Sequence, residues 1–325
     1  MWVQRTVKIP FLELSFYVPA CAYSEFSLHF SAHNRAQVRF KSDFFDFARF
    51  ETSLFHLLED AVASYFVYPN HFGVSVLLAL CEEVHIHSGR LVVAPQAESY
   101  RIDIFNQLIS KEICLDFKIS PTFGIFSPAE LETVETYLQS LAYLHPFQKI
   151  IYAHLPPLET QRKVFFYPNG IAALLDYTIA QNRNTTILFR IDKHFELADC
   201  EIRFCLAYAD CWTSQSCVRS FANDREMFWD DSVLEGIFDA LRLTANALDT
   251  PDKAQKQNFS KQQLRKTLIL IAHTKGENLA LGSTGQSLRM PALRKFVKIQ
   301  AHIFLLNYFS QYPILGKKWI HHLNY

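Results

Sequence analysis

Apolar side chains recur along this chain with two different periods. Segments in which apolar and polar residues alternate predict strands that are buried on one face. These predicted strands are residues 11–18, 24–33, 36–45, 84–86, 149–154, 163–168, 187–191, 200–209, 216–222 and 267–274, and the stretch 90–126 also alternates like sheet. Segments with apolar residues three and four positions apart predict helices instead. The predicted helices are residues 53–66, 74–83, 129–144, 170–180, 232–247 and 291–308.

Capping residues support two of these helices. Ser127 precedes the helix at 129–144, and Asp231 or Ser232 begins the helix at 232–247. Such side chains accept hydrogen bonds from the first free backbone amides of a helix. Because strands and helices are interleaved along the chain, the pattern predicts a layered α+β or α/β fold.

The composition is that of a globular protein. Half of the 325 residues are apolar and 20% are charged, so the chain is long enough for two domains. The 29 Phe and 14 Tyr residues are expected to lie mostly in the core. Because the formal net charge is zero, no overall field draws the chain to nucleic acid or to an anionic membrane.

The spacing of glycines excludes several nucleotide-binding motifs. The chain has nine Gly, and no two of them are separated by a single residue. Phosphate-binding loops need glycine where the backbone approaches the phosphate or takes a positive φ. The dinucleotide G-x-G-x-x-G, the kinase glycine-rich loop and the G-x-x-x-x-G-K loop are therefore absent, as are G-x-S-x-G and H-E-x-x-H.

The cysteines and the N-terminus favour a cytoplasmic protein. Seven Cys occur without a C-x-x-C pair, which is typical of reduced thiols, and the start of the chain has no leader-like pattern. A zinc site could be drawn from Cys200, Cys205, Cys211 and Cys217, but their spacings place them on opposite faces of strands, so we expect no metal.

Two smaller clusters have simple structural interpretations. His85 and His87, beside Glu83, share one side of a strand without a third ligand nearby, which favours an exposed strand face. The basic and aromatic residues at 317–322 could contact phosphate, but a solvated C-terminus is the favoured interpretation.

Four segments, in order, resemble the B subunit of DNA gyrase and its topoisomerase IV counterpart. Residues 54–64 are similar to the helix that ends in E-x-x-D-N, and residues 72–80 to the segment after the ATP lid. Residues 119–177 are similar to the next part of that ATPase domain, with FFYPNGIAALLDY at 165–177. In the fourth segment, EIRFCLAYAD at 201–210, Phe221-Ala222-Asn223 and the helix at 232–247 resemble the transducer domain.

This resemblance covers about residues 52–315 and implies an α+β fold in two parts. Residues 1–182 would form a reduced two-layer α/β sandwich of the GHKL (Bergerat) type. Residues 183–325 would form a transducer-like α/β domain.

The same resemblance implies that the ATPase chemistry is degraded. The general base of the family is a Glu, and Asp60 occupies its place; Ser64 occupies the place of the Asn that holds Mg²⁺. Between Ser64 and Gly73, the remnant of the lid, only eight residues remain, too few for the adenine-binding strand. The Q-T-K loop, whose Lys reaches the γ-phosphate, reads Ser-Thr-Gly around Thr284.

Three hypotheses follow. The first is a non-catalytic relative of the topoisomerase ATPase and transducer region, without cofactor, that acts through an unidentified protein partner and touches DNA at most indirectly. The second is a divergent ATP-dependent topoisomerase subunit that uses ATP and Mg²⁺ with Asp60 as base. The third is an unrelated α+β binding module with a Phe-rich surface.

Overall fold

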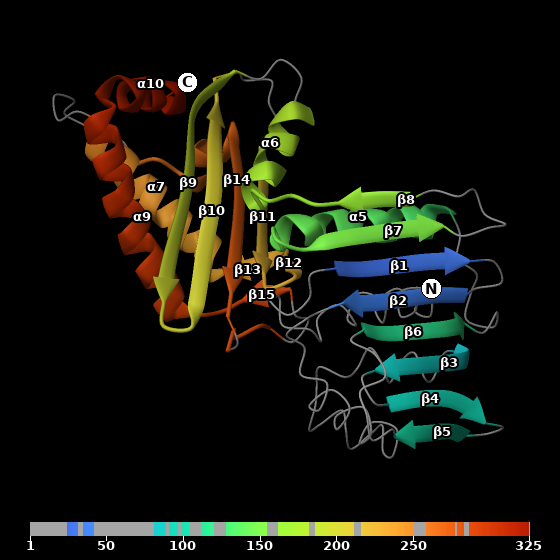
Figure 1. Ribbon diagram of the computed structural model, residues 1–325. Coiled ribbons are helices and arrows are strands. Elements are labelled where there is room, and N and C mark those ends of the chain that lie inside the picture. The colour runs from blue at the N-terminus through green and yellow to red at the C-terminus, as the bar shows by residue number, and fades with distance from the viewer. Residues whose placement is uncertain are drawn as a thin grey trace. The chain divides into compact units, whose positions relative to one another are not determined.

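The computed structural model of the protein forms two compact units, Met1–Pro168 and Asn169–Tyr325 (Figure 1). The boundary precedes helix α6, so this helix belongs to the second unit, whereas the sequence placed the division after it, at 182 and 183. The residues that the structure describes are 25–31, 35–41, 81–88, 91–96, 99–104, 112–119, 128–154, 162–181, 186–210, 216–249, 258–276, 278–282 and 286–324.

The first unit contains an eight-stranded sheet in the order β5-β4-β3-β6-β2-β1-β7-β8. Its strands are β1 (Glu25–Ser31), β2 (Arg35–Lys41), β3 (Cys81–Ser88), β4 (Leu91–Gln96), β5 (Ser99–Ile104), β6 (Glu112–Ile119), β7 (Lys149–His154) and β8 (Arg162–Phe165). Strands β1 and β7 are parallel, and the other neighbours are antiparallel.

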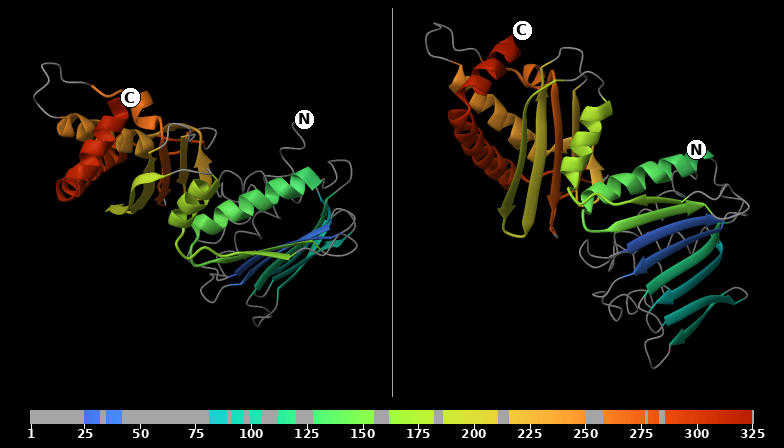
Figure 2. Two further views of the ribbon diagram at one scale, coloured as in Figure 1. Left: turned by 90° about the horizontal axis from the view of Figure 1, so that it is seen from above. Right: turned by 45° about the horizontal axis from the view of Figure 1, so that its top comes forward.

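Alternation along these strands creates one apolar face. Leu28 and Phe30 of β1 are buried, while His29 between them lies on the opposite face. Helix α5 (Pro128–Leu144) packs on the apolar face through Val134 and Leu138. Figure 2 shows α5 lying across one side of this sheet, so the unit has a sheet layer and a helix layer.

The second unit contains a five-stranded sheet in the order β12-β11-β14-β10-β9. Its strands are β9 (Ile187–Leu197), β10 (Cys200–Ala209), β11 (Cys217–Ala222), β12 (Arg225–Met227) and β14 (Leu268–Lys275), and a separate parallel pair is formed by β13 (Trp229–Asp231) and β15 (Ser287–Leu288). Its helices are α6 (Ile171–Gln181), α7 (Ser232–Leu248), α8 (Lys261–Arg265), α9 (Pro291–Gln311) and α10 (Pro313–Asn324). Strands β11 and β14 are parallel neighbours, joined through α7 and α8.

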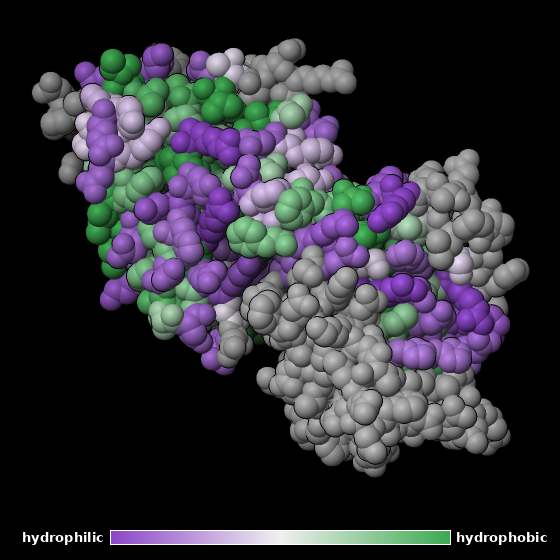
Figure 3. All heavy atoms as spheres, viewed as in Figure 1, coloured by the Kyte–Doolittle hydropathy of each residue, from purple (hydrophilic) through white to green (hydrophobic). Residues whose placement is uncertain are grey.

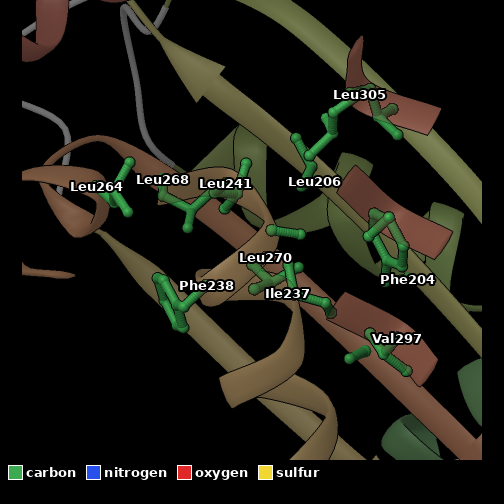
Figure 4. Packing of buried hydrophobic residues seen from close by; sticks show 14 of the residues in the cluster. Phe204, Leu206, Ile237, Phe238, Leu241, Leu264, Leu268, Leu270, Val297 and Leu305 are labelled. Atoms are coloured by element: carbon green, nitrogen blue, oxygen red, sulfur yellow. The ribbon is translucent and has the colours of Figure 1, made fainter. Parts of the chain in front are cut away.

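Helices cover both faces of this second sheet (Figure 2). On one face, side chains of β10 and β14 form a continuous core with α7, α9 and α10; Figure 4 shows Phe204 and Leu270 there, beside Ile237 of α7 and Val297 of α9. Helix α6 packs on β14 and β10. Because both faces are buried, β14 reads as a continuous apolar run, Leu268 to Ala272, rather than as an alternation.

The last helix corrects the sequence interpretation of the C-terminus. Residues 317–322 lie within α10, and Trp319 at their centre is fully buried rather than solvated. Its ring stacks on Phe309 of α9 at a centroid distance of 5.0 Å and meets Phe189 of β9 edge-on at 5.8 Å. The polar residues around Trp319 suggest a solvated segment, but its buried residues are spaced as on one face of a helix. They are Gly316, Trp319, Ile320 and Leu323.

Several other sequence predictions are confirmed by the structure. Helix α7 begins at Ser232, with Asp231 as its N-cap, and β10 spans the predicted residues 200–209. The predicted helix at 53–66, residues 74–80 of the next predicted helix and the cap Ser127 lie outside the described residues. Residues 81–83, predicted as the end of that helix, are the start of strand β3 instead. Their prediction as helix is therefore wrong, because they pair with β6 in the sheet. Within the described part of the chain, no helix has both the length and the hydropathy required to cross a membrane.

Candidate functional site

The candidate nucleotide site is described only at its edge. Asp60, Ser64 and Gly73 lie outside the described residues, and so does Thr284. The structure does describe both ends of the loop that carries Thr284, at Gly282 and Gln286, and this base is the part of the predicted site that can be built from its contacts.

The two ends of this loop are held together as a hairpin. Leu281 and Leu288 form an antiparallel bridge, and the amide of Gly282 donates to the carbonyl oxygen of Ser287 at 2.9 Å. Any β-carbon at position 282 would collide with the Ser287 hydroxyl, so this position accepts only glycine without a shift of Ser287. The residues that flank the segment 283–285 are therefore held in place by this hairpin.

The hairpin is also attached to the start of α7. Strand β15 pairs with β13, the amide of Phe228 donates to the carbonyl of Gln286 at 3.0 Å, and the amide of Met290 donates to the Ser232 hydroxyl at 2.8 Å. Arg289 forms an exposed ion pair with Asp230 at 2.8 Å. The loop base is thus positioned by the same turn that begins α7.

Asp231 is a buried carboxylate at this turn. One of its oxygens accepts the backbone amides of Val233 and Leu234, at 2.6 and 3.1 Å, and so caps α7. Burial raises the pKa of Asp231, while the Ser220 hydroxyl and those two amides act in the opposite direction. Its contacts give Asp231 a structural role at the base of the loop.

Asn223 locks the ends of β11 and β14 together, which gives the Phe-Ala-Asn motif a structural function. Asn223 lies in the left-handed region at φ 51°, and its amide group exchanges two hydrogen bonds of 3.1 Å with the backbone N–H and C=O of Gly276. The carbonyl of Asn223 accepts from His273 Nε2 at 2.8 Å, which assigns the proton of that imidazole to Nε2. Asparagine tolerates this conformation better than most residues do.

Gly236 marks the closest approach of α7 and α9. A β-carbon there would lie 2.8 Å from the carbonyl oxygen of Arg294 and 3.0 Å from Cβ of Val297. The glycine that aligns with the transducer-helix motif is therefore required by helix packing. No ligand contact is needed to explain it.

Three of the four cysteines considered for a zinc site lie within the described residues. Cys200 and Cys205 are buried free thiols, Cys217 is half-buried, and Cys211 lies outside the described residues. Burial raises the pKa of the Cys205 thiol well above its ordinary value, which disfavours the thiolate that zinc would need. Over the described ranges, no three His, Cys, Asp or Glu side chains are arranged to hold a metal ion.

The histidines of β3 lie on a polar sheet face, as predicted. His85 is partly exposed and His87 is exposed, while the neighbouring Glu83 pairs with Arg35 of β2. Arg35 also reaches Asp116 of β6 at 3.3 Å. The side chains of these ion pairs are more than a third exposed, so each pair contributes little to stability. This face of the sheet is therefore a solvated surface with ion pairs between neighbouring strands.

Comparisons with solved structures place this geometry in a known fold. The 43K ATPase domain of Thermus thermophilus gyrase B, solved with an aminocoumarin, aligns with 97% of this chain and 87% of its own, at 15% identity and a TM-score of 0.69. The gyrase B subunit from Myxococcus xanthus aligns with 97% of this chain and 93% of its own, at 16% identity and 0.71. The topoisomerase IV ATP-binding domain of Francisella tularensis, solved with a small-molecule inhibitor, aligns with 99% and 90%, at 14% identity and 0.71.

The chain therefore has the α+β fold of the gyrase B and topoisomerase IV ATPase domains, of GHKL type, which confirms the predicted resemblance at the level of fold. The unrelated fold of the third hypothesis is wrong for the same reason. No protein-family model matches the sequence, and no curated protein matches it either. The fold is thus shared over nearly the whole chain at 14–16% identity.

Proposed function

We propose that this chain is a non-catalytic relative of the ATPase and transducer region of type II DNA topoisomerases, and that it acts through contacts with another protein. One observation carries the proposal. Nearly the whole chain keeps the fold of these ATPase domains at 14–16% identity, while the residues that the motif resemblance assigns to the nucleotide chemistry differ from the family's.

The loop at 283–285 illustrates the contrast. Its base is fixed by the Gly282–Ser287 hydrogen bond and by the attachment of β15 to the start of α7, so the packing needed to aim such a loop is present. The sequence that this base presents is Ser-Thr-Gly, without a cation. A triphosphate at this position would lack a charged hydrogen-bond donor, which is the strong kind of contact for phosphate.

The first unit contributes a second line of support. Asp60 is one methylene shorter than the Glu of the resemblance, and Ser64 offers a hydroxyl where an amide carbonyl would hold Mg²⁺. Only eight residues separate Ser64 from Gly73. We infer that the adenine-binding strand and the ATP lid are missing.

The test is a titration of the full chain with ATP and Mg²⁺ in a calorimeter, with phosphate release measured in parallel. We expect no saturable heat and no turnover above the buffer rate. Saturable binding with a micromolar dissociation constant, or steady phosphate release, would show that the proposal is wrong.

The alternative is a divergent ATP-dependent topoisomerase subunit that works with separate cleavage subunits and uses ATP and Mg²⁺. The carboxylate retained at Asp60 and the similarity to domains that bind ATP favour it. It requires Asp60→Asn to abolish turnover, with Glu59→Gln as the neighbouring control that keeps it. A wild-type protein without turnover rules it out.

The proposal also includes a cellular location and a mode of contact with DNA. The five cysteines in the described residues are free thiols, which favours a reducing, cytoplasmic location. The neutral chain provides no general attraction for DNA, so any DNA contact is proposed to be indirect, through the partner.

A further inference from the structure

The last two helices carry an unusual charge distribution. Residues 291–325 contain five Lys and Arg and no Asp or Glu, although the whole chain has 32 of each kind. Because the total is neutral, residues 1–290 carry a net charge of −5 (27 Lys and Arg against 32 Asp and Glu) and residues 291–325 carry a net charge of +5. This segment is therefore a basic region within a neutral protein.

Helix α9 presents apolar residues on its outer side. Its buried line runs through Leu293, Val297, Ala301, Leu305 and Phe309, each four residues from the next. The opposite line runs through Lys295, Ile299 and Ile303, and the two isoleucines are 45% and 50% exposed. One helical turn separates them, so they form a short apolar ridge that begins beside a lysine.

Helix α10 also exposes an apolar residue beside lysines. Trp319, Ile320 and Leu323 face the core, while Ile314 is 71% exposed and Lys317 and Lys318 point to solvent. In Figure 3, apolar and hydrophilic residues lie side by side over α9 and α10. We call the set Lys295, Lys298, Ile299, Ile303, Ile314, Lys317 and Lys318 the α9–α10 face.

The lysines of this face have no partner within the described residues. No ion pair of Lys295, Lys298, Lys317 or Lys318 occurs in the described part of the chain. The neighbouring Arg294 differs, because it bonds the carboxylate of Asp239 on α7 at 2.8 Å. The two acidic residues of α7, Glu235 and Asp239, are thus already paired with Lys261, Arg242 and Arg294. The lysines of the face remain available to a carboxylate from outside.

We propose that the α9–α10 face docks an acidic amphipathic helix of a protein partner. The isoleucine ridge fits the apolar side of such a helix, and the lysines that border it fit flanking Asp or Glu residues. This inference rests on the proposed function, since it names the surface and the chemistry of the partner.

Other occupants fit the same surface less well. A lipid surface would demand a broader apolar stripe with large aromatic anchors, whereas the aromatic rings of α9 and α10 lie mainly in the core. Single-stranded nucleic acid stacks on successive exposed rings, whereas Tyr312, 50% exposed, is the only exposed Phe, Tyr or Trp among the described residues 291–324. Complementary shape and charge therefore favour an acidic helix.

The test uses a fluorescent peptide of 21 residues, the length of α9, with Leu on one face and Glu along its borders. A scrambled peptide of the same composition is the control ligand. Anisotropy with the full-length protein should show saturable binding of the amphipathic peptide alone, weakened by added salt. The double variants Ile299→Ser/Ile303→Ser and Lys295→Glu/Lys298→Glu should each bind about tenfold more weakly or worse.

Phe147→Ser is the matched control variant, because Phe147 is 84% exposed but belongs to the first unit. It should leave the affinity unchanged, and circular dichroism of each variant confirms folding. Equal binding of both peptides, no binding of either, or binding unaffected by the double variants would overturn the inference.

Three further readouts distinguish other occupants. Phosphatidylserine vesicles, a single-stranded DNA oligonucleotide and self-association measured by ultracentrifugation are each compared between wild type and Lys295→Glu/Lys298→Glu. A wild-type signal that this variant abolishes would assign the face to lipid, nucleic acid or a second copy instead. None of these measurements involves ATP, so failure here is separate from failure of the proposed function.

Discussion

Replacing Gly236 by alanine adds one methyl group where α7 and α9 lie closest. In an exposed helix interior this change would stabilise the fold by about 1 kcal/mol, because alanine restricts the unfolded chain and favours the helix. Here the new β-carbon would lie 2.8 Å from a backbone oxygen, that of Arg294, and 3.0 Å from Cβ of Val297. A backbone atom cannot rotate away, so relief requires α9 itself to move.

Movement of α9 is costly because its inner line is fully buried. Val297, Ala301 and Leu305 are each 0% exposed and form part of the main core of the second unit. Overpacking in such a core costs about 1–3 kcal/mol, which exceeds the gain in helix propensity. We expect Gly236→Ala to lower the free energy of unfolding by about 1–2 kcal/mol.

Gly316 provides the matched control, since it is a buried helical glycine in the same unit. A β-carbon there would meet its nearest neighbours, the rings and methyls of Phe309 and Leu248, at 3.4–3.5 Å, which is ordinary contact. Gly316→Ala should therefore stabilise the protein by about 0.5–1 kcal/mol. The same substitution thus acts with opposite signs on two helices.

Urea unfolding, followed by fluorescence of tryptophan and by circular dichroism, measures both changes. Unchanged m-values would show that the two variants alter stability rather than the compactness of the unfolded chain. A Gly236→Ala protein as stable as wild type would refute the argument, because it would mean that α7 and α9 can separate without loss.

Two further predictions concern the turns around the candidate loop. Asn223→Ala removes both side-chain hydrogen bonds to Gly276 and places alanine at φ 51°. The free energy of unfolding should therefore fall by about 1–3 kcal/mol in the same urea assay. An unchanged urea midpoint would show that Asn223 does not hold β11 and β14 together. For Asp231, burial raises the folded pKa, so the stability that it contributes is present at low pH and is lost as pH rises through that pKa. Measured against Asp231→Asn, which also caps a helix, the wild type should lose relative stability as pH rises above 3.8; a relative gain would show that the sign is wrong.

The sequence predicted the elements whose packing is regular. Strand β10 and helix α7 were found from periodicity and a capping Asp, because both signals are local. Helix α10 was missed because Pro313 interrupts the pattern and the letters around Trp319 are basic. Trp319 of this helix is buried against the rings of Phe189 and Phe309. These tertiary contacts cannot be predicted from the sequence around Trp319.

The candidate site shows a different limit. The resemblance assigned Asp60, Ser64, Gly73 and Thr284 by alignment of motifs, and all four positions lie outside the described residues, so these assignments stay predictions. What the structure adds are the contacts around them, such as the close approach of Gly282 to the Ser287 hydroxyl. Close approach of this kind depends on a neighbouring strand, so sequence spacing cannot predict it.

The aromatic contact between β9 and α10 has a consequence for synthesis. Phe189 is synthesised well before Trp319, yet the two rings pack against each other in the finished core. Helix α9 covers part of β9 through Phe309, but until α10 has left the ribosome Phe189 lacks the Trp319 ring that packs on it in the finished core. The second unit must therefore finish folding late, and a chaperone that shields β9 during translation would be expected to raise the yield of native protein.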